Sequence, residues 1–289
     1  MGIIYTDVRN LIEQFRPESE GKQVVTLGRL NVCLHPNEIS RLRKIFAGDA
    51  EAQSYFDTYI WREYSERFFK QLFKCTTVDS LDFSSYEGAT IVHDLQQPIT
   101  DTLRNKYDLV FDGGTLEHVF NLPVAMANLI ELARVGGLIY SHSPSNNLSG
   151  HGLYQFSPEL LYRVMSHNNG LAVIFVRVGI ARFPNIELSP FHRVFDVADP
   201  ASVGTRVGLL SSRPAYVMSM ARKTADVKPF SQPVLQSDYV QAWNGDAQKL
   251  GLARKIFHRL PFRLKCLISG YRAAFQHSLA NKKVYHRVR

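Results

Sequence analysis

The chain has 289 residues, of which 45% are hydrophobic and 21% are charged, a composition typical of a globular protein that buries a sizeable core. No apolar run approaches the roughly 20 residues that cross a bilayer, because the best candidate, "LAVIFVRVGIARF", is interrupted by Arg177 and Arg182. The N-terminus "MGIIYTDVRN" lacks the pattern of a signal peptide, so a cytoplasmic location is expected.

The net charge of +8 is concentrated near the C-terminus. The segment from Lys249 onward carries eleven lysines and arginines and no acid, so the preceding chain has a net charge of −3. The three cysteines, Cys33, Cys75 and Cys266, are far apart and form no C-x-x-C pair. Neither a disulfide framework nor a metal site is therefore expected.

The first quarter of the chain predicts a helix, a buried strand and a helical insertion. Apolar residues recur at helical spacing within residues 1–22, and "QVVTLGRLNVCL" is typical of a buried strand and the turn after it. The charged and aromatic segment over about residues 36–74 predicts two further helices, one on each side of Gly48.

Predicted strands and helices alternate through the middle of the chain. The runs "CTTVDSLDF", "ATIVHDL" and "KYDLVFDGG" predict three strands. A helix capped by Asn121 and ended by Gly136 and Gly137 is expected next, followed by the strand "LIYSHSP". Ser157 is expected to cap another helix, which precedes the strand "LAVIFVRV".

The last third predicts a long connection, a final strand and an extension. Residues 183–214 contain four prolines and no clear period, and "AYVMSMAR" predicts the last strand. Pro229 and Pro233 mark a linker, so an α/β domain over residues 1–228 and an extension over residues 229–289 are expected. Apolar residues of the extension recur at amphipathic helical spacing, with basic residues between them: Leu264, Leu267, Ile268, Tyr271 and Phe275.

Strands that alternate with helices predict a doubly wound, mostly parallel sheet with helices on both faces. Ligands of such sheets bind beyond the carboxyl ends of the strands. Glycines and polar residues stand at these predicted ends. They are Gly28 after the first strand, Asp79 or Asp82 after the second, Asp94 after the third, and Asp112, Gly113 and Thr115 after the fourth.

This arrangement suits an adenosyl group. A carboxylate after the second strand can accept two hydrogen bonds from ribose hydroxyls, and Asp82 is preferred because it lies closer to the predicted strand end. Asp94 can accept from the adenine amino group, and the glycines let the backbone approach the ligand closely. Structural roles stay open for the same residues: a turn glycine, surface acids and a helix cap.

The segment "YDLVFDGGTLEHV" resembles the fourth strand of the class I S-adenosylmethionine-dependent methyltransferases, with their usual "LEHV" ending. "LIELARVGGLIYSHSP" is similar to the turn and fifth strand of that family, and "HGLYQFSPELLYRVM" to the segment before its next helix. The resemblance covers roughly residues 23–182. It implies a Rossmann-like sheet of seven strands in the order 3-2-1-4-5-7-6, with the last strand antiparallel, and S-adenosyl-L-methionine as cofactor.

The first motif departs from the pattern of that family. The family has an acid and a G-x-G, whereas this chain reads "VVTLGRLNV", in which Gly28 is followed by Arg29 and Leu30 and Thr26 stands in place of the acid. The acids after the second strand follow Gly28 by more than 50 residues, against about 20 in the comparable dinucleotide fold. The helical insertion is therefore expected near the site. A nicotinamide cofactor is disfavoured because no G-x-G-x-x-G follows a predicted strand.

His118 is the candidate general base, because it follows the fourth strand and histidine titrates near neutral pH. His151 in "SNNLSGHGLYQF" is the second choice. Methyl transfer depends mainly on positioning and needs a base only where the nucleophile must lose a proton early. A purely structural role at the start of a helix also stays open for His118.

Two functions follow from this sequence. One is a methyltransferase that acts on a small-molecule, glycan or lipid-linked acceptor, and the other is a non-catalytic module of the same fold that works as an interaction or scaffold protein. For the basic extension, a helix packed on the body and a peripheral contact with an anionic membrane are both open. Nucleic acid is disfavoured because no recognisable binding motif is present.

Overall fold

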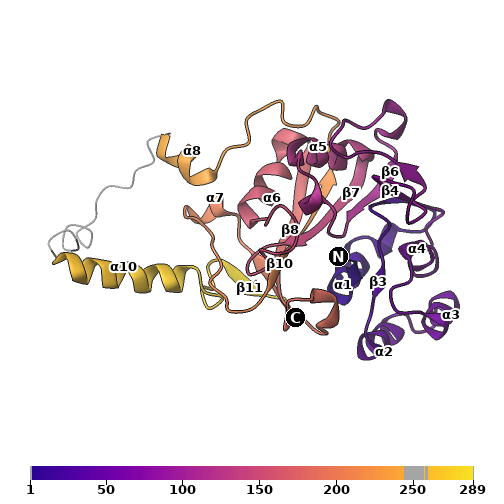
Figure 1. Cartoon of the computed structure of the whole chain (residues 1–289), viewed down its shortest axis with the longest axis horizontal. Helices are drawn as coiled ribbons and strands as arrows, with labels where there is room; N and C mark the ends of the chain where they lie inside the picture. The colour runs from indigo at the N-terminus through magenta and orange to yellow at the C-terminus, as the bar shows by residue number, and fades with distance from the viewer. Residues whose placement is uncertain (1, 244–256, 258–259, 289) are drawn as a thin grey trace.

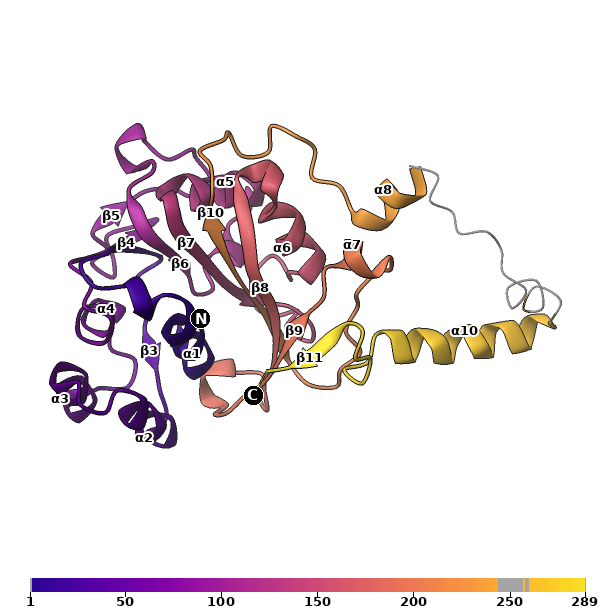
Figure 2. The same cartoon turned by 180° about the vertical axis from the view of Figure 1, so that it is seen from behind.

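The computed structural model describes residues 2–243, 257 and 260–288. A nine-stranded sheet forms its centre (Figures 1 and 2), made of β2 (Gln23–Leu27), β4 (Thr77–Asp82), β5 (Ile91–Val92), β6 (Tyr107–Asp112), β7 (Ala133–Pro144), β8 (Leu171–Ile180), β9 (Arg193–Val197), β10 (Ala215–Lys223) and β11 (Tyr285–Arg287). The strand order is β5-β4-β2-β6-β7-β10-β8-β9-β11. Strand β10 is antiparallel to both of its neighbours, so the first seven positions confirm the predicted order 3-2-1-4-5-7-6.

Helices cover both faces of this sheet (Figures 1 and 2): α1 (Tyr5–Gln14), α2 (Pro36–Ile45), α3 (Ala50–Thr58), α4 (Ser65–Phe73), α5 (Leu122–Leu132), α6 (Pro158–Val164) and α7 (Pro200–Val203). Alternate side chains of the strands enter two separate cores, because successive residues of a strand face opposite sides. Phe111 and Tyr140 pack with α1 and α4 on one face. Their neighbours Val110 and Ile139 pack with α5 and α6 on the other. The predicted doubly wound fold is confirmed.

The helical insertion consists of three helices, α2, α3 and α4, where two were predicted. The helical structure is interrupted between α3 and α4, and Arg62 in this interruption has a left-handed φ of +65°. The Tyr59 hydroxyl accepts from the Leu34 amide and donates to the Val32 carbonyl, both at 2.8 Å. These bonds fix the break on β3 (Val32–Cys33), which pairs in parallel with β1 (Ile3–Ile4). A helical pattern in the sequence does not reveal these hydrogen bonds, because they join residues more than 20 positions apart.

One predicted helix end is wrong, and of the two predicted N-terminal caps, both at the correct position, one forms its side-chain hydrogen bond and the other does not. Helix α5 ends at Leu132, and the glycine pair lies inside β7, where a Cβ at Gly137 would be 2.9 Å from the Tyr107 carbonyl oxygen of β6. Asn121 makes no side-chain cap and donates instead to the Gln96 carbonyl at 3.1 Å. Ser157 does cap α6, because its hydroxyl accepts from the Leu160 amide at 3.2 Å.

The predicted long connection contains β9 and α7, and the predicted extension returns to the sheet as β11, which pairs with β9. The extension also forms α8 (Ser237–Trp243) and α10 (Phe262–Gln276). Helix α10 projects away from the body (Figures 1 and 2), and none of its residues is buried. No helix in the described part of the chain is long and apolar enough to span a bilayer. Five basic residues of the predicted tail lie outside the described residues: Lys249, Arg254, Lys255, Arg259 and Arg289.

Candidate functional site

The carboxyl ends of β2 and β4 bring Gly28 and Asp82 together. Gly28 has a φ of +74°, a conformation that favours glycine, and a Cβ at this position would be 3.8 Å from Oδ2 of Asp82. Within the described residues, the Asp82 carboxylate has no hydrogen-bonding or ionic partner. The strand ends therefore present a free carboxylate beside Gly28, where a Cβ would also meet the Thr115 hydroxyl at 2.8 Å.

The predicted place of Asp79 at this edge is wrong. Asp79 lies within β4, three residues before the strand ends, and is paired in register with Val25 of β2. Its Oδ2 accepts from the Tyr107 hydroxyl at 2.7 Å and from Nζ of Lys106 at 3.4 Å. Tyr107 begins β6, so the Asp79 carboxylate is engaged near the opposite end of the sheet.

Asp94 follows β5, the strand whose last residue, Val92, is paired with Asp82 at the end of β4. Its Oδ1 accepts from the Gln96 amide at 2.9 Å, which stabilises the turn that follows. The sequence left open that Asp94 caps a following helix, but no helix begins here and the bond stabilises a turn instead. The second carboxylate oxygen of Asp94 has no partner among the residues described, so one acceptor remains for a ligand.

At the end of β6, Asp112 and Thr115 shape the loop. Asp112 is fully buried, and it accepts from the Thr115 amide at 2.8 Å and from the Ser141 hydroxyl at 2.8 Å. Burial and the nearby Glu117 carboxylate raise the pKa of Asp112. The Thr115 hydroxyl donates to the Leu27 carbonyl at 2.6 Å and so ties this loop to the end of β2. Asp112 and Thr115 therefore stabilise the loop after β6 and its attachment to the end of β2.

The unusual first motif also has a structural explanation. Thr26, in place of the acid, donates to the Gly28 carbonyl at 2.7 Å and fixes the turn. Arg29 pairs with Glu66 of α4 at 2.7 Å and lies over the Tyr64 ring at 4.0 Å, so it ties the insertion to the site.

Leu30 takes the place of the second glycine. Its side chain is buried, and its Cδ1 lies 2.7 Å from where a Cβ of Gly113 would be. The glycine after β6 is therefore needed for the packing of Leu30, and the two strand ends are in direct contact through this side chain.

Beyond β6, the structure brings together His118, His151 and a residue that the sequence analysis missed, Glu117. The His118 and His151 rings lie 5.3 Å apart, and Nε2 of His151 is 3.6 Å from Oε1 of Glu117. The Glu117 side chain is fully buried, and neither of its oxygens has a hydrogen-bond partner in the described chain. The "LEHV" motif contained the signal, because Glu117 directly precedes the histidine that was chosen.

Residues 148–154 hold His151 against Glu117. The amides of Leu153 and Tyr154 donate to the Glu117 carbonyl at 2.7 and 3.2 Å. Gly152 has a φ of +78°, and a Cβ there would lie 2.7 Å from Cγ of Glu117. The loop can therefore dock this closely only with glycine at position 152.

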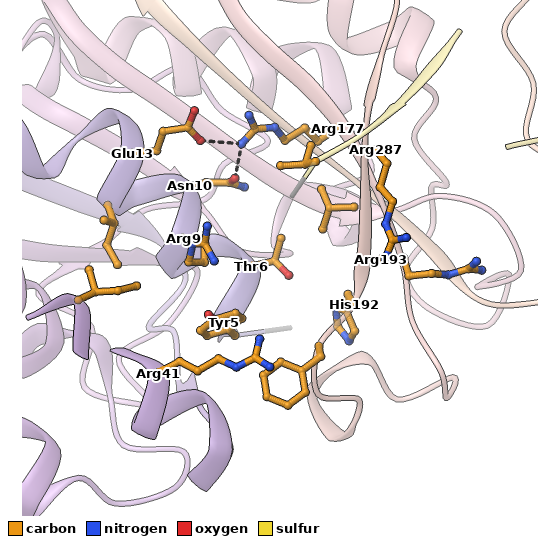
Figure 3. Close-up of a pocket in the computed structure, with 15 residues that line it drawn as sticks. Tyr5, Thr6, Arg9, Asn10, Glu13, Arg41, Arg177, His192, Arg193 and Arg287 are labelled. Atoms are coloured by element: carbon orange, nitrogen blue, oxygen red, sulfur yellow. Dashed lines mark hydrogen bonds and ion pairs between the residues drawn. The ribbon is translucent and has the colours of Figure 1, made fainter. Parts of the chain in front are cut away.

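The structure has one cavity beside His151 and a larger one elsewhere. A cavity of about 590 Å³ next to His151 is lined by Arg62, residues 147–151 and residues 184–187. A larger one of about 1050 Å³ lies between α1, α2 and the strands β8, β9 and β11 (Figure 3). Five arginines line this larger cavity, which the sequence analysis did not predict: Arg9, Arg41, Arg177, Arg193 and Arg287.

No family model matches the sequence, and no curated protein matches it. Solved structures with a similar fold include a geranyl diphosphate methyltransferase in complex with S-adenosylmethionine, which shares 12% identity at a TM-score of 0.42 over 76% of this chain and 85% of the other. The Burkholderia thailandensis 1,6-didemethyltoxoflavin-N1-methyltransferase, with S-adenosylhomocysteine bound, shares 13% identity at a TM-score of 0.36 over 76% and 84%. A SAM-dependent methyltransferase from Archaeoglobus fulgidus shares 11% sequence identity at a TM-score of 0.38, over 76% of this chain and 94% of the other.

The strand order of this chain, with its antiparallel β10, is itself the order that the class I methyltransferase resemblance implied. The chain therefore has the Rossmann-like methyltransferase fold, extended at one edge by β9 and β11.

Proposed function

We propose that this protein is an S-adenosylmethionine-dependent methyltransferase. The observation that carries the proposal is the Asp82 carboxylate, which has no partner in the described structure and lies beside the Cβ-free backbone of Gly28. A carboxylate at this place suits the two hydroxyls of a ribose. The free oxygen of Asp94 suits the adenine amino group. S-adenosylmethionine supplies an electrophilic methyl group when it is bound.

The residues of this chain would position the two reactants. Gly28, Asp82 and Asp94 hold the nucleoside part of the cofactor, while Thr115 keeps the ends of β2 and β6 together through its bond to Leu27. Alignment of the acceptor atom with the methyl group supplies most of the rate enhancement in such a transfer. His118 and His151 lie beyond β6, where either can take a proton from an acceptor that must lose one.

The acceptor belongs to the class of small molecules, glycans or lipid-linked intermediates. Two features support this proposal. The cavity of about 590 Å³ beside His151 has the size of a small-molecule site. The bonds of the loop 148–154 to Glu117 place His151 both at this cavity and 5.3 Å from the His118 ring.

Thermal unfolding with different ligands tests the proposed function. S-adenosylhomocysteine at 100 times its dissociation constant should stabilise the fold by about 2.7 kcal/mol, whereas NAD at the same concentration should not. A protein that is stabilised by NAD, or by neither compound, would contradict the proposal. In the latter case the non-catalytic alternative would gain support.

We also propose that α10 attaches the protein to the cytoplasmic surface of an anionic membrane. Its apolar stripe is exposed, and the exposed fractions of Leu267, Tyr271 and Phe275 are 56%, 74% and 61%. Its charged residues are Arg263, Lys265 and Arg272, and it contains no acid. An exposed apolar stripe with flanking cations suits an anionic lipid surface.

Sedimentation with vesicles tests this attachment. Binding to anionic but not to neutral vesicles is expected, with weaker binding at high salt. Replacing Leu267 and Tyr271 by serine should abolish it, and replacing the exposed Leu210 should not. Equal binding of the two variants would contradict a role for α10.

A further inference from the structure

We propose that Glu117, His118 and His151 bind a divalent transition-metal ion. Each residue offers one ligand atom, and these atoms all lie within 4.8 Å of one another. Ligand atoms that bind a tetrahedral ion at about 2.1 Å lie about 3.4 Å apart. The most distant pair therefore has to close by at most about 1.4 Å, which a change of side-chain rotamer supplies.

The second observation is the carboxylate of Glu117, which has His151 at 3.6 Å but no hydrogen bond in the described structure. The side chain is fully buried, and both oxygens lack a hydrogen-bond partner among the described residues. Nε2 of His151 is likewise buried without a hydrogen bond. Buried polar groups of native proteins are nearly always satisfied, and a lone buried carboxylate is costly. A cation between Glu117 and the two imidazoles would satisfy all of these atoms.

The donor set points to the kind of ion. Two imidazoles and one carboxylate suit zinc, cobalt, iron or nickel, whereas calcium and magnesium prefer oxygen ligands. Three protein ligands leave coordination positions for another molecule. His151 lines the cavity of about 590 Å³, so a molecule in this cavity can reach the ion.

The role of the ion in the reaction rests on the proposed function. A hydroxyl group of the acceptor that binds the ion would have a lower pKa and lose its proton to solvent more readily. The ion would also fix the position of the acceptor oxygen. Glu117 and the histidines would then act as ligands, and neither histidine would be the base.

Titration of the metal-free full-length protein with Zn²⁺ and Co²⁺ tests the site, without cofactor or acceptor. The exposed Cys266 should first be replaced by serine, because a free thiol can bind either ion. One equivalent of Co²⁺ should bind and give visible absorption bands. Glu117→Gln and His151→Ala should each weaken binding by more than about 100-fold. His286→Ala, at an exposed position in β11, is the matched control and should not change the affinity.

Two further readouts keep a folding defect apart from loss of the site. Glu117→Gln removes a buried charge, so the metal-free variant should unfold at a temperature at least as high as the parent. S-adenosylhomocysteine should still bind this variant. Unchanged metal affinity in Glu117→Gln, or the absence of metal binding by the parent, would overturn the metal site. If the parent does not bind S-adenosylhomocysteine, the proposed function is overturned instead.

We infer from an independent observation that the larger cavity binds a molecule with a pyrophosphate or similar polyanionic group. Arg177 is neutralised by Glu13 at 3.1 Å and Asp196 at 2.8 Å. Arg9, Arg193 and Arg287 have no acidic partner in the described ranges, although they surround the same space (Figure 3).

The residues that line this cavity include one acid, Glu13, and it is paired with Arg177. Burial lowers the pKa of His192 to about 4, so that it is neutral at physiological pH. Arginine clusters favour phosphate groups. The volume of about 1050 Å³ leaves room for a large body attached to the anion.

Titration with pyrophosphate tests this cavity. Arg193→Ala and Arg287→Ala should each weaken binding about tenfold, whereas Arg213→Ala, an exposed arginine outside the cavity, should not. A nucleoside diphosphate and a polyprenyl pyrophosphate in detergent then distinguish a soluble from a lipid-linked ligand. Equal affinity of all three variants for pyrophosphate, or no binding at all, would overturn the inference.

Discussion

Replacing Asp82 by alanine should weaken cofactor binding strongly and leave the fold intact. The carboxylate would accept two hydrogen bonds from the ribose, and a hydrogen bond to a charged group contributes about 1.5–3 kcal/mol. At the lower value for each bond, the loss is about 3 kcal/mol, which corresponds to an affinity for S-adenosylhomocysteine on the order of 100-fold weaker. Because Asp82 has no partner in the described structure, the free energy of unfolding should change by no more than about 0.5 kcal/mol.

Asp79 offers a matched control three residues earlier in the same strand. Asp79→Ala removes the acceptor of the Tyr107 hydroxyl and should destabilise the fold by about 1–3 kcal/mol. Its affinity for S-adenosylhomocysteine should remain that of the parent. Calorimetric titration and urea unfolding of both variants measure the two effects. Normal binding by Asp82→Ala, or a greater loss of affinity in Asp79→Ala, would refute the assignment of the ribose site.

Three other predictions concern the supporting structure and use unfolding measurements. Gly152→Ala should destabilise the fold by about 2–4 kcal/mol, because the residue has a positive φ and its Cβ would meet Glu117. Gly150→Ala is the control, because the space around its Cβ is open. Equal effects of the two substitutions would count against the docked loop. The low pKa of His192, about 4, predicts that stability falls by up to about 3 kcal/mol as the pH decreases from about 6.5 to 4, since the unfolded state binds the proton more tightly. His192→Gln should flatten the curve in this range, and an unchanged curve would contradict the assignment. Ser157→Ala should cost about 1 kcal/mol through the lost helix cap, and no change would mean that the cap contributes nothing.

The existence of the seven central strands could be predicted because each strand has its own local pattern, and their order was implied by the resemblance to the methyltransferase family. Strand β9 was missed because it pairs with β8 from within a proline-containing segment that has no clear period, and β11 because it is short and pairs only when the chain returns to β9. The same limit applies to the break at Tyr59, which depends on contacts with β3 more than 20 residues away.

The candidate site shows a similar division. Residue type and position after a strand were sufficient to predict that Gly28 and Asp82 stand at the carboxyl ends of β2 and β4, and they favoured Asp82 over Asp79. They did not show that Asp79 is already hydrogen-bonded, because its bond to Tyr107 depends on the register of three strands. Glu117 was missed because only the structure shows that its carboxylate is buried without a partner beside two histidines.

Calorimetric titration of the purified full-length protein with S-adenosylmethionine and S-adenosylhomocysteine tests the proposed cofactor site most directly. The account predicts one binding site with micromolar affinity for both compounds, in spite of the unusual "VVTLGRLNV" motif. A protein shown by circular dichroism to be folded that binds neither compound would contradict it.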